Sequence, residues 1–337
     1  MLCDRNTPYH VPRLPSDSEH ALNRSVLTGQ LANYPRTNAV AIPSQDPIVV
    51  APSPTPFRRD DTLDFAAIEH NVARWLKTPL SGFVLNSENG EEAFLSESEQ
   101  LEIVRTVQRV NNNRKLLIAG IDNPSVRETL RIADSLVSAG AELVRIRIPR
   151  LTSNLDGYFD TVIPRIAVPV LIIHQMAPGT FLSHAAPAGA EATQIGDWVA
   201  RDNVFGYIAS ADLRFEARVR SFITPAKRFW AGNGSLLLAG VAVGANGACM
   251  MLGNVAPQEC CDIVRHAMAG ELKQAQTIQD RVLELDWQIL ARRAAGLKVA
   301  LTLLGFDSGL PRSPSQAGDD QDIQQIREAL RRAGLLT

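Results

Sequence analysis

The stretch Leu116-Leu117-Ile118-Ala119-Gly120 is a short apolar run, and a second run, Leu143–Ile148, follows it at a distance that one helix fills. Between them, Ser125–Ala139 carries apolar residues at the period of an amphipathic helix. A strand, a helix and a strand in this order are typical of two parallel strands joined by a crossover helix, because parallel strands are covered on both faces and therefore read as apolar runs. The same unit recurs on both sides of this stretch, so it decides the fold class.

The remaining units extend the pattern in both directions. The other predicted strands are Ile48–Ala51, Gly82–Leu85, Val170–His174, Val204–Ile208, Arg228–Ala231 and Gly247–Met251. The other predicted helices are Phe65–Leu76, Ser96–Val110, Leu155–Ile166, Thr193–Ala200, Leu213–Ser221 and Ser235–Val243. Eight such units in about 220 residues predict an α/β fold of the closed (β/α)8 TIM barrel type. An open doubly wound sheet is the alternative, but no Gly-rich dinucleotide loop follows the first strand.

The segments outside the barrel differ from it in composition. Residues 1–45 are rich in Pro, Asn, Ser and Arg without periodicity, which predicts an irregular N-terminal extension before a barrel over 46–256. Residues 257–337 are predicted to form a C-terminal helical region, with helices over Pro257–Ala269, Leu272–Leu290, Ala294–Leu304 and Ile323–Ala333.

Composition excludes several classes of protein. The chain is 45% hydrophobic and 21% charged with a net charge of −2, so we expect neither nucleic acid nor a membrane as a partner. The N-terminus has no apolar run of a secretory signal. The four cysteines form no disulfide framework, and Cys260-Cys261 reads as part of a helix, so a cytoplasmic location is expected.

Several landmarks occur in an order that points to one family. They are Gly82–Leu85 leading into Asn89-Gly90-Glu91, the loop Ala231–Ser235, the segment Gly244–Pro257 and the linker Leu303–Pro314. Together they resemble the family of dihydrodipicolinate synthase and N-acetylneuraminate lyase, which are pyruvate-handling (β/α)8 aldolases. The resemblance implies a lyase without a cofactor that assembles as a homodimer or homotetramer. It also implies a lysine at the end of the sixth strand, which forms a Schiff base with the substrate.

The predicted sixth strand lacks that lysine. It reads Val204-Phe205-Gly206-Tyr207-Ile208-Ala209-Ser210, and Ile208 falls at the lysine's place. The chain has five lysines, and the pattern puts each of them at a helix end, a strand entrance or a C-terminal helix: Lys77, Lys115, Lys227, Lys273 and Lys298. We therefore predict that none of them forms an imine.

Two residues are candidates for acid or base catalysis. The fifth strand of the family ends in Tyr-Asn, and here the matching residues are Ile173-His174-Gln175, with a one-residue ambiguity of register. His174 can act as an acid or base near neutral pH, or it is a histidine hydrogen-bonded in the barrel mouth. Glu88 follows the second strand where the family binds a carboxylate. We expect Glu88 to pair with Arg147, Arg150 or His174, or to be protonated, because a buried unpaired carboxylate is costly.

Other residues are candidates for substrate binding. Asn89 offers amide donors, and Arg147 and Arg150 follow the fourth strand. A structural role for Arg145, Arg147 and Arg150 in ion pairs with Glu142 or Glu88 is the alternative. Gly232 and Asn233 occupy the seventh-strand loop, where they bind an anion or shape a tight turn. The fifth-strand loop, Pro178-Gly179-Thr180, lacks the arginine that the family uses there, and Arg150-Leu151 replaces its paired tyrosines.

A metal site is not expected. The candidate ligands are scattered over separate loops, namely His174, His184, Asp122, Glu88 and Glu91. The segment Asp122–Ser125 and Asp212 are better explained as helix caps.

The sequence thus predicts a lyase-family barrel with an altered active site that binds a small organic acid and does not use pyruvate Schiff-base chemistry. The alternative is a non-catalytic protein on the same barrel that binds a small ligand or supports assembly.

Overall fold

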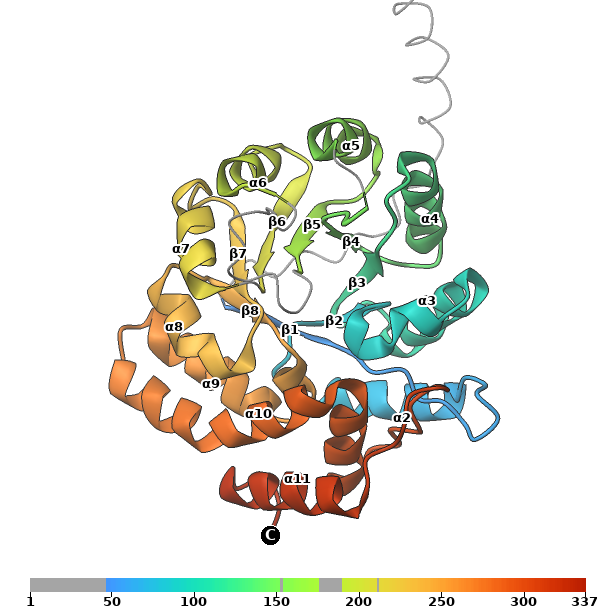
Figure 1. Cartoon of the computed structure of the whole chain (residues 1–337), viewed down its shortest axis with the longest axis vertical. Coiled ribbons are helices and arrows are strands. Elements are labelled where there is room, and N and C mark those ends of the chain that lie inside the picture. The colour runs from blue at the N-terminus through green and yellow to red at the C-terminus, as the bar shows by residue number, and fades with distance from the viewer. Residues whose placement is uncertain (1–46, 152–153, 176–189, 211) are drawn as a thin grey trace, which may run out of the picture. The chain divides into compact units, whose positions relative to one another are not determined.

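The computed structural model describes residues 47–151, 154–175, 190–210 and 212–337. Eight strands follow one another around a closed barrel, each parallel to its neighbours (Figure 1). They are β1 (Ile48–Pro52), β2 (Gly82–Leu85), β3 (Leu116–Ile121), β4 (Leu143–Arg147), β5 (Val170–His174), β6 (Val204–Ala209), β7 (Arg228–Ala231) and β8 (Gly247–Cys249). The predicted (β/α)8 barrel is confirmed.

Helices surround this barrel (Figure 1). They are α2 (Phe65–Trp75), α3 (Glu97–Asn111), α4 (Val126–Ser138), α5 (Leu155–Val162), α6 (Ala192–Val199), α7 (Leu213–Ser221) and α8 (Leu237–Ala242). The caps expected at Ser125 and Asp212 are present, because their side chains accept backbone N–H groups of α4 and α7. The structure also shows a capping box formed by Ser96 and Glu99 at the start of α3.

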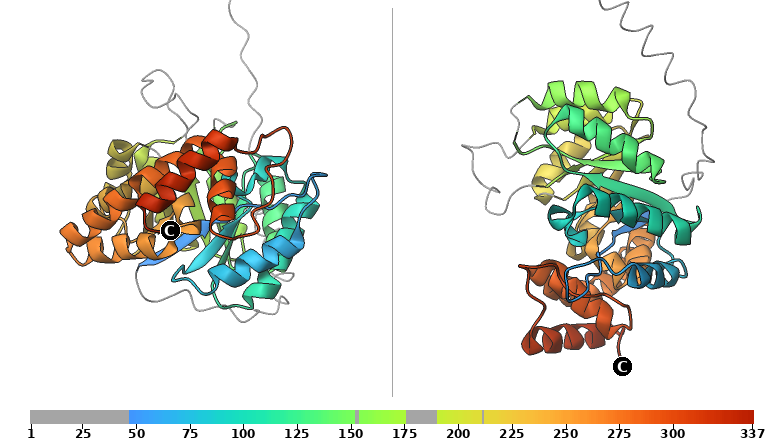
Figure 2. Two further views of the ribbon diagram at one scale, coloured as in Figure 1. Left: turned by 90° about the horizontal axis from the view of Figure 1, so that it is seen from below. Right: turned by 90° about the vertical axis from the view of Figure 1, so that its right-hand side faces the viewer.

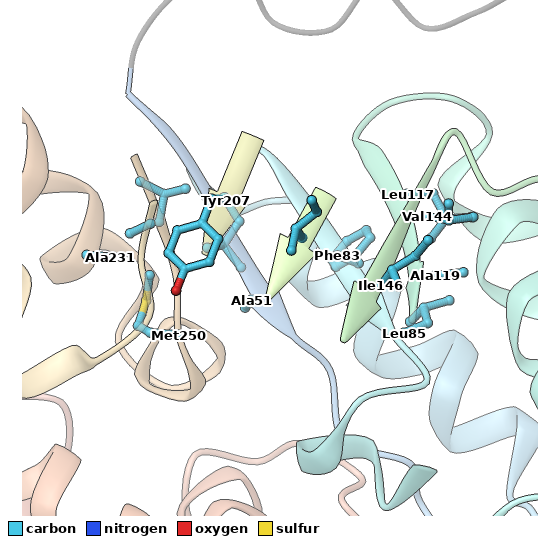
Figure 3. Packing of buried hydrophobic residues seen from close by; sticks show 14 of the residues in the cluster. Ala51, Phe83, Leu85, Leu117, Ala119, Val144, Ile146, Tyr207, Ala231 and Met250 are labelled. Atoms are coloured by element: carbon cyan, nitrogen blue, oxygen red, sulfur yellow. The ribbon is translucent and has the colours of Figure 1, made fainter. Parts of the chain in front are cut away.

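The alternation of side chains along each strand divides the core in two. One set fills the barrel interior: Ile48, Val50, Val84, Leu116, Ile118, Leu143, Leu171, Ile173, Ile208, Trp230 and Cys249. The other set faces the helices, and Figure 3 shows part of it, including Leu117, Val144 and Tyr207 from three strands. Because residues two apart share a face, Arg145 and Arg147 lie on the interior side of β4 with Leu143. This places two charged side chains inside the barrel near its C-terminal mouth.

Two predicted elements end two or more residues earlier than the periodicity suggested. The segment Leu155–Ile166 becomes α5 followed by the short 3-10 helix η4 (Ile163–Arg165), since Pro164 cannot donate a backbone hydrogen bond. The last strand stops at Cys249, and Met251 begins the 3-10 helix η6 (Met251–Asn254) instead of extending the strand.

The C-terminal region contains α9 (Pro257–Met268), α10 (Leu272–Leu303) and α11 (Asp320–Arg332). The sequence predicted two helices where α10 runs, with a break after Leu290. The structure confirms this break, because α10 consists of two helical segments that meet at a kink at Arg293, whose φ of 52° and ψ of −132° are not helical. Figures 1 and 2 show α10 and α11 together at the same side of the barrel as α2. The Asn71 side chain of α2 donates to the Asp307 carbonyl oxygen at 2.8 Å and joins the two regions.

Two ion pairs hold the C-terminal chain to the loop after β2 and to the first turn of α3. Glu91 pairs with Lys298 of α10, and both side chains are buried. Arg312 binds Glu99 through two hydrogen bonds of 2.7 and 2.8 Å, and these lower the pKa of Glu99 to about 2. The C-terminal region therefore positions residues at the barrel mouth. The boundaries expected at residues 45 and 256 stay predictions, and residues 1–46 lie outside the described residues.

Candidate functional site

Two adjoining hollows lie at the C-terminal ends of the strands. The inner cavity has a volume of about 350 Å³ and is bordered by residues that follow β2, β5, β6 and β7, such as Ser87, Gln175, Ser210 and Gly232. The outer groove has a volume of about 870 Å³ and runs over the ends of β3 and β4. Both are lined by Glu88, Gln175 and Arg293. This end of a (β/α)8 barrel is where such proteins carry their active sites.

The floor of the inner cavity is apolar. Ile173 of β5 and Ile208 of β6 are paired in register, and both line the cavity together with Val84 and Cys249. Ile208 is 0% exposed. Burial raises the pKa of the Cys249 thiol to about 12, so this thiol is neutral at physiological pH.

No lysine is among the described residues that line either hollow. Two lysines lie at the opposite end of the barrel. Lys115 donates to the Thr78 and Leu80 carbonyl oxygens, which precede β2. Lys227 donates to the Arg201 and Val204 carbonyl oxygens at 2.6 and 2.7 Å. Lys298 is held by Glu91. Lys77 is exposed in the turn after α2, and Lys273 is exposed on α10. These positions agree with those expected from the sequence.

Arg145 is the buried cation of the inner cavity. Its side chain is 2% exposed, and its Nη2 donates to the Asn86 carbonyl oxygen at 3.1 Å and to Glu92 at 3.0 Å. A Cβ atom on Gly120 would lie 2.2 Å from this nitrogen, so the glycine gives the guanidinium its space. The Nε of Arg145 and the Oγ of the buried Ser87 have no hydrogen-bond partner among the described residues. Two unsatisfied donors thus belong to residues that line the same cavity.

A second arginine, Arg147, is held between carboxylates. It pairs with Glu92 and Asp122, and its Nε donates to the Gln175 side chain at 2.7 Å. Burial lowers the pKa of Arg147, but the two carboxylates outweigh that effect and raise it above its ordinary value. Arg150 pairs with Asp122 at 3.0 Å. Both arginines line the outer groove, and carboxylates already neutralise much of their charge.

The expected pairing of Glu88 was wrong. Its side chain is 53% exposed, accepts from Gln175 at 3.2 Å and lies 3.9 Å from Arg293. The arginines of β4 pair instead with Glu92, and Arg147 also pairs with Asp122. The physical reason is solvation, because an exposed carboxylate needs no buried partner. Glu88 therefore stands at the rim shared by the two hollows.

His174 lies apart from both hollows. It is 3% exposed, and its ring packs against Phe215 of α7 with 5.4 Å between ring centroids. Its neighbour Ile173 faces the barrel interior, so alternation turns His174 toward the surrounding helices. The described residues that line the hollows do not include it. A catalytic role for His174 stays a prediction.

The structure brings the other predicted residues to the mouth. Asn89, Gly232 and Asn233 line the inner cavity, and Arg147 and Arg150 line the outer groove. The side chain of Asn233 accepts the Ser235 backbone N–H at 3.0 Å and so shapes the loop after β7. Pro178-Gly179-Thr180 and His184 lie outside the described residues.

Sequence reasoning missed four contributors: Arg145 as a lining residue, Ser87, Glu92 and Asp286. Alternation along β4 was the signal that could have placed Arg145 inside the barrel. Asp286 is a buried carboxylate of α10 that lines the inner cavity and accepts a hydrogen bond from Ser235. Burial raises the pKa of Asp286, although the hydrogen bonds from Ser235 lower it in part.

The described ranges of the chain contain neither a metal cluster nor a helix that could span a membrane. No three His, Cys, Asp or Glu side chains gather there in an arrangement that could hold a metal ion. No described helix has the length and apolar character needed to cross a membrane.

Comparison with known proteins agrees with the fold. The model of the dihydrodipicolinate synthetase family matches residues 47–333. A 4-hydroxy-tetrahydrodipicolinate synthase of Acidiphilium cryptum is 28% identical over 288 residues, which are 84% of this chain and 96% of that protein. An uncharacterized DapA-like lyase of Halobacterium salinarum is 29% identical over 314 residues, covering 89% of this chain and 99% of that protein.

The solved structures resemble this chain in the same region. The structure of DHDPS from Cyanidioschyzon merolae with lysine bound superposes with a TM-score of 0.78 at 22% identity, covering 86% of this chain and 98% of that chain. That likeness shows the fold. The family model spans nearly all of the described barrel and C-terminal helices. The chain therefore belongs to the dihydrodipicolinate synthetase family.

Proposed function

We propose that the inner cavity binds a small organic acid and that the protein does so without forming an imine. The observation that carries this proposal is that the inner cavity is lined both by a buried cation, Arg145, and by an apolar floor that includes Ile173 and Ile208. Arg145 supplies a guanidinium with a free Nε, and Ser87 supplies a hydroxyl. A carboxylate accepts from both kinds of donor, and charge-assisted hydrogen bonds of this type are the strong ones.

The floor supports the second half of the proposal. An imine requires an amine within reach of the ligand's carbonyl carbon. Ile208 stands where the family resemblance places the Schiff-base lysine, and Ile173 lies beside it in register. An apolar side chain at each of these positions supplies neither the amine nor a hydroxyl to relay protons.

The rim residues have supporting parts in this proposal. Asn89, Gly232 and Asn233 line the inner cavity and contact the ligand, while Glu88 acts from the exposed rim. Arg147 and Arg150 both form ion pairs with Asp122, and these pairs fix the side chains that line the outer groove. Assembly as a homodimer or homotetramer and a cytoplasmic location stay predictions.

A non-catalytic binding or assembly protein is the second candidate. One observation favours it, because His174, the predicted acid or base, packs against Phe215 away from the described lining of both hollows. A ligand-binding role requires Arg145 and Ser87 but no proton relay at this position. An enzyme and a non-catalytic binding protein would both use the carboxylate site, but only the enzyme would convert the bound acid into a product.

A binding screen tests the carboxylate site. We expect at least one acid among pyruvate, 2-oxoglutarate, N-acetylneuraminate and alanine to raise the melting temperature, since a ligand that binds only the folded state stabilises it. Ser87→Ala is expected to weaken binding of that acid by about tenfold, because a hydrogen bond to a charged group contributes about 1.5–3 kcal/mol. Calorimetric titration measures the affinity.

Two controls make the screen specific. Ser98→Ala changes an exposed serine and should leave the affinity unaltered. The uncharged amide of the strongest-binding acid should bind much more weakly, because it offers Arg145 no negative charge. An amide that binds as well as its acid, or a panel in which no acid stabilises the protein, would contradict the proposal.

A further inference from the structure

Asp286 is a buried carboxylate that forms no ion pair within the described part of the chain. It is 4% exposed, its Oδ2 accepts from the Ser235 hydroxyl, and a Cβ atom on Gly234 would lie 2.4 Å from its Oδ1. The nearby arginines of α10 pair elsewhere, namely Arg281 with Glu259, Arg292 with Asp322 and Arg293 with Glu88. Among the described residues, no ion pair includes Asp286, yet it lines the inner cavity.

The inner cavity therefore has two polar poles. Arg145 belongs to β4 and reaches toward Asn86 and Glu92, which follow β2. Asp286 lies against the loop after β7, through its contact with Ser235. In a closed barrel of eight strands in sequence order, β4 stands opposite β8, so these groups approach the cavity from different sides. A ligand held by Arg145 at one end meets Asp286 along its length or at its other end.

We propose that Asp286 takes up a proton from solvent when an acid binds to Arg145 and Ser87, and then donates that proton in a hydrogen bond to a second oxygen of the ligand. This inference rests on the proposed carboxylate site. It narrows the ligand class to acids that carry a further oxygen, such as an oxo, hydroxyl or second carboxyl group. It also places the cavity's proton-transferring group on α10 and not on β5.

The surroundings of Asp286 favour its neutral form. The buried thiol of Cys260, on α9, faces Asp286. Burial raises the pKa of this thiol well above its ordinary value, so the thiol brings no charge to the site. The other charged groups near the site are Glu259, Glu88, Arg145 and Arg293. Burial raises the pKa of Asp286 itself, and a bound anion raises it further because like charges repel. Ligand binding is therefore coupled to proton uptake, and the affinity falls as the pH rises.

Proton counting by calorimetry tests this inference. The strongest-binding acid of the four-acid panel is titrated into the full chain in phosphate and in Tris, whose ionisation enthalpies differ, from pH 6 to pH 8. We expect wild-type protein to take up as much as one proton per ligand and to lose as much as about tenfold in affinity per pH unit. Asp286→Asn should bind the acid with no proton uptake. At the upper pH it should bind more tightly than wild type, because it lacks the repelling charge.

Two further variants separate a titrating role from a structural one. Ser235→Ala keeps the carboxyl group but removes a hydrogen bond that favours its ionised form, so the pH dependence should move to higher pH. Asp280→Asn, an exposed aspartate on the same helix, should behave like wild type. Unchanged proton uptake in Asp286→Asn would overturn this inference and leave the carboxylate site standing. Failure of every acid in the panel to bind would overturn both.

Discussion

Replacing Arg145 by methionine is expected to weaken acid binding by about 100-fold or more while changing the free energy of unfolding by less than about 1.5 kcal/mol. Removing one partner of a buried, charge-assisted contact costs about 2–5 kcal/mol of binding. The folded protein loses little, because Glu92 keeps its pair with Arg147 and the Arg145 Nε has no hydrogen bond among the described residues. Relief from burying a charge offsets the lost contacts. Urea unfolding and calorimetric titration measure the two quantities.

The same substitution two residues further along β4 provides the matched control. Arg147→Met removes contacts to Glu92, Asp122 and Gln175 at once, so we expect it to lower the free energy of unfolding by about 3–5 kcal/mol. Arg147 lines the outer groove and not the inner cavity, so acid binding by the folded fraction should persist. If Arg145→Met retained full acid affinity, or if Arg147→Met alone abolished it, the assignment of the carboxylate site to Arg145 would be wrong.

Replacing Lys298 by methionine should have the opposite profile, with a large loss of stability and no loss of binding. Its ammonium group is paired with Glu91, and both side chains are at least 96% buried. Among the described residues, the substitution leaves the buried Glu91 carboxylate with the Arg312 backbone N–H, at 2.9 Å, as its donor, so the free energy of unfolding should fall by about 3–5 kcal/mol. Chemical denaturation monitored by circular dichroism measures this change.

Two comparisons decide whether Lys298 is structural. Lys273→Met on the same helix is exposed and should change stability by less than about 0.5 kcal/mol. Adding Glu91→Gln to Lys298→Met should recover part of the loss, because the buried charge is then absent. A Lys298→Met protein of normal stability that no longer binds acids would instead make this lysine part of the site.

The barrel could be predicted because its strands are covered on both faces and its helices on one. Val170–His174, Arg228–Ala231 and Leu213–Ser221 have the bounds that the sequence predicted. The break in α10 at Arg293 could also be predicted, because it falls in the gap that the sequence left between Leu290 and Ala294. The end of the last strand could not, because the turn of Met251 into η6 depends on tertiary contacts.

The site was harder to predict for a related reason. Its charges pair across loops that are distant in sequence, as Arg147 does with Glu92 and Asp122. Glu88 and Glu92 belong to the same loop, and nothing in their residue type shows which is exposed. Asp286 reaches the cavity from a helix that follows the whole barrel in the chain, so no local pattern marks it. The alternation of a strand, in contrast, is local, and it places Arg145 inside the barrel from the sequence alone.

Reductive trapping with pyruvate tests the central claim most directly. The full chain is incubated with excess pyruvate and sodium borohydride, and its intact mass and peptide masses are measured beside an imine-forming aldolase as a positive control. Because Ile208 lies on the cavity floor and the five lysines lie elsewhere, the account predicts no added mass on this protein while the control is modified. A stable adduct mapped to Lys77, Lys115, Lys227, Lys273 or Lys298 would contradict it.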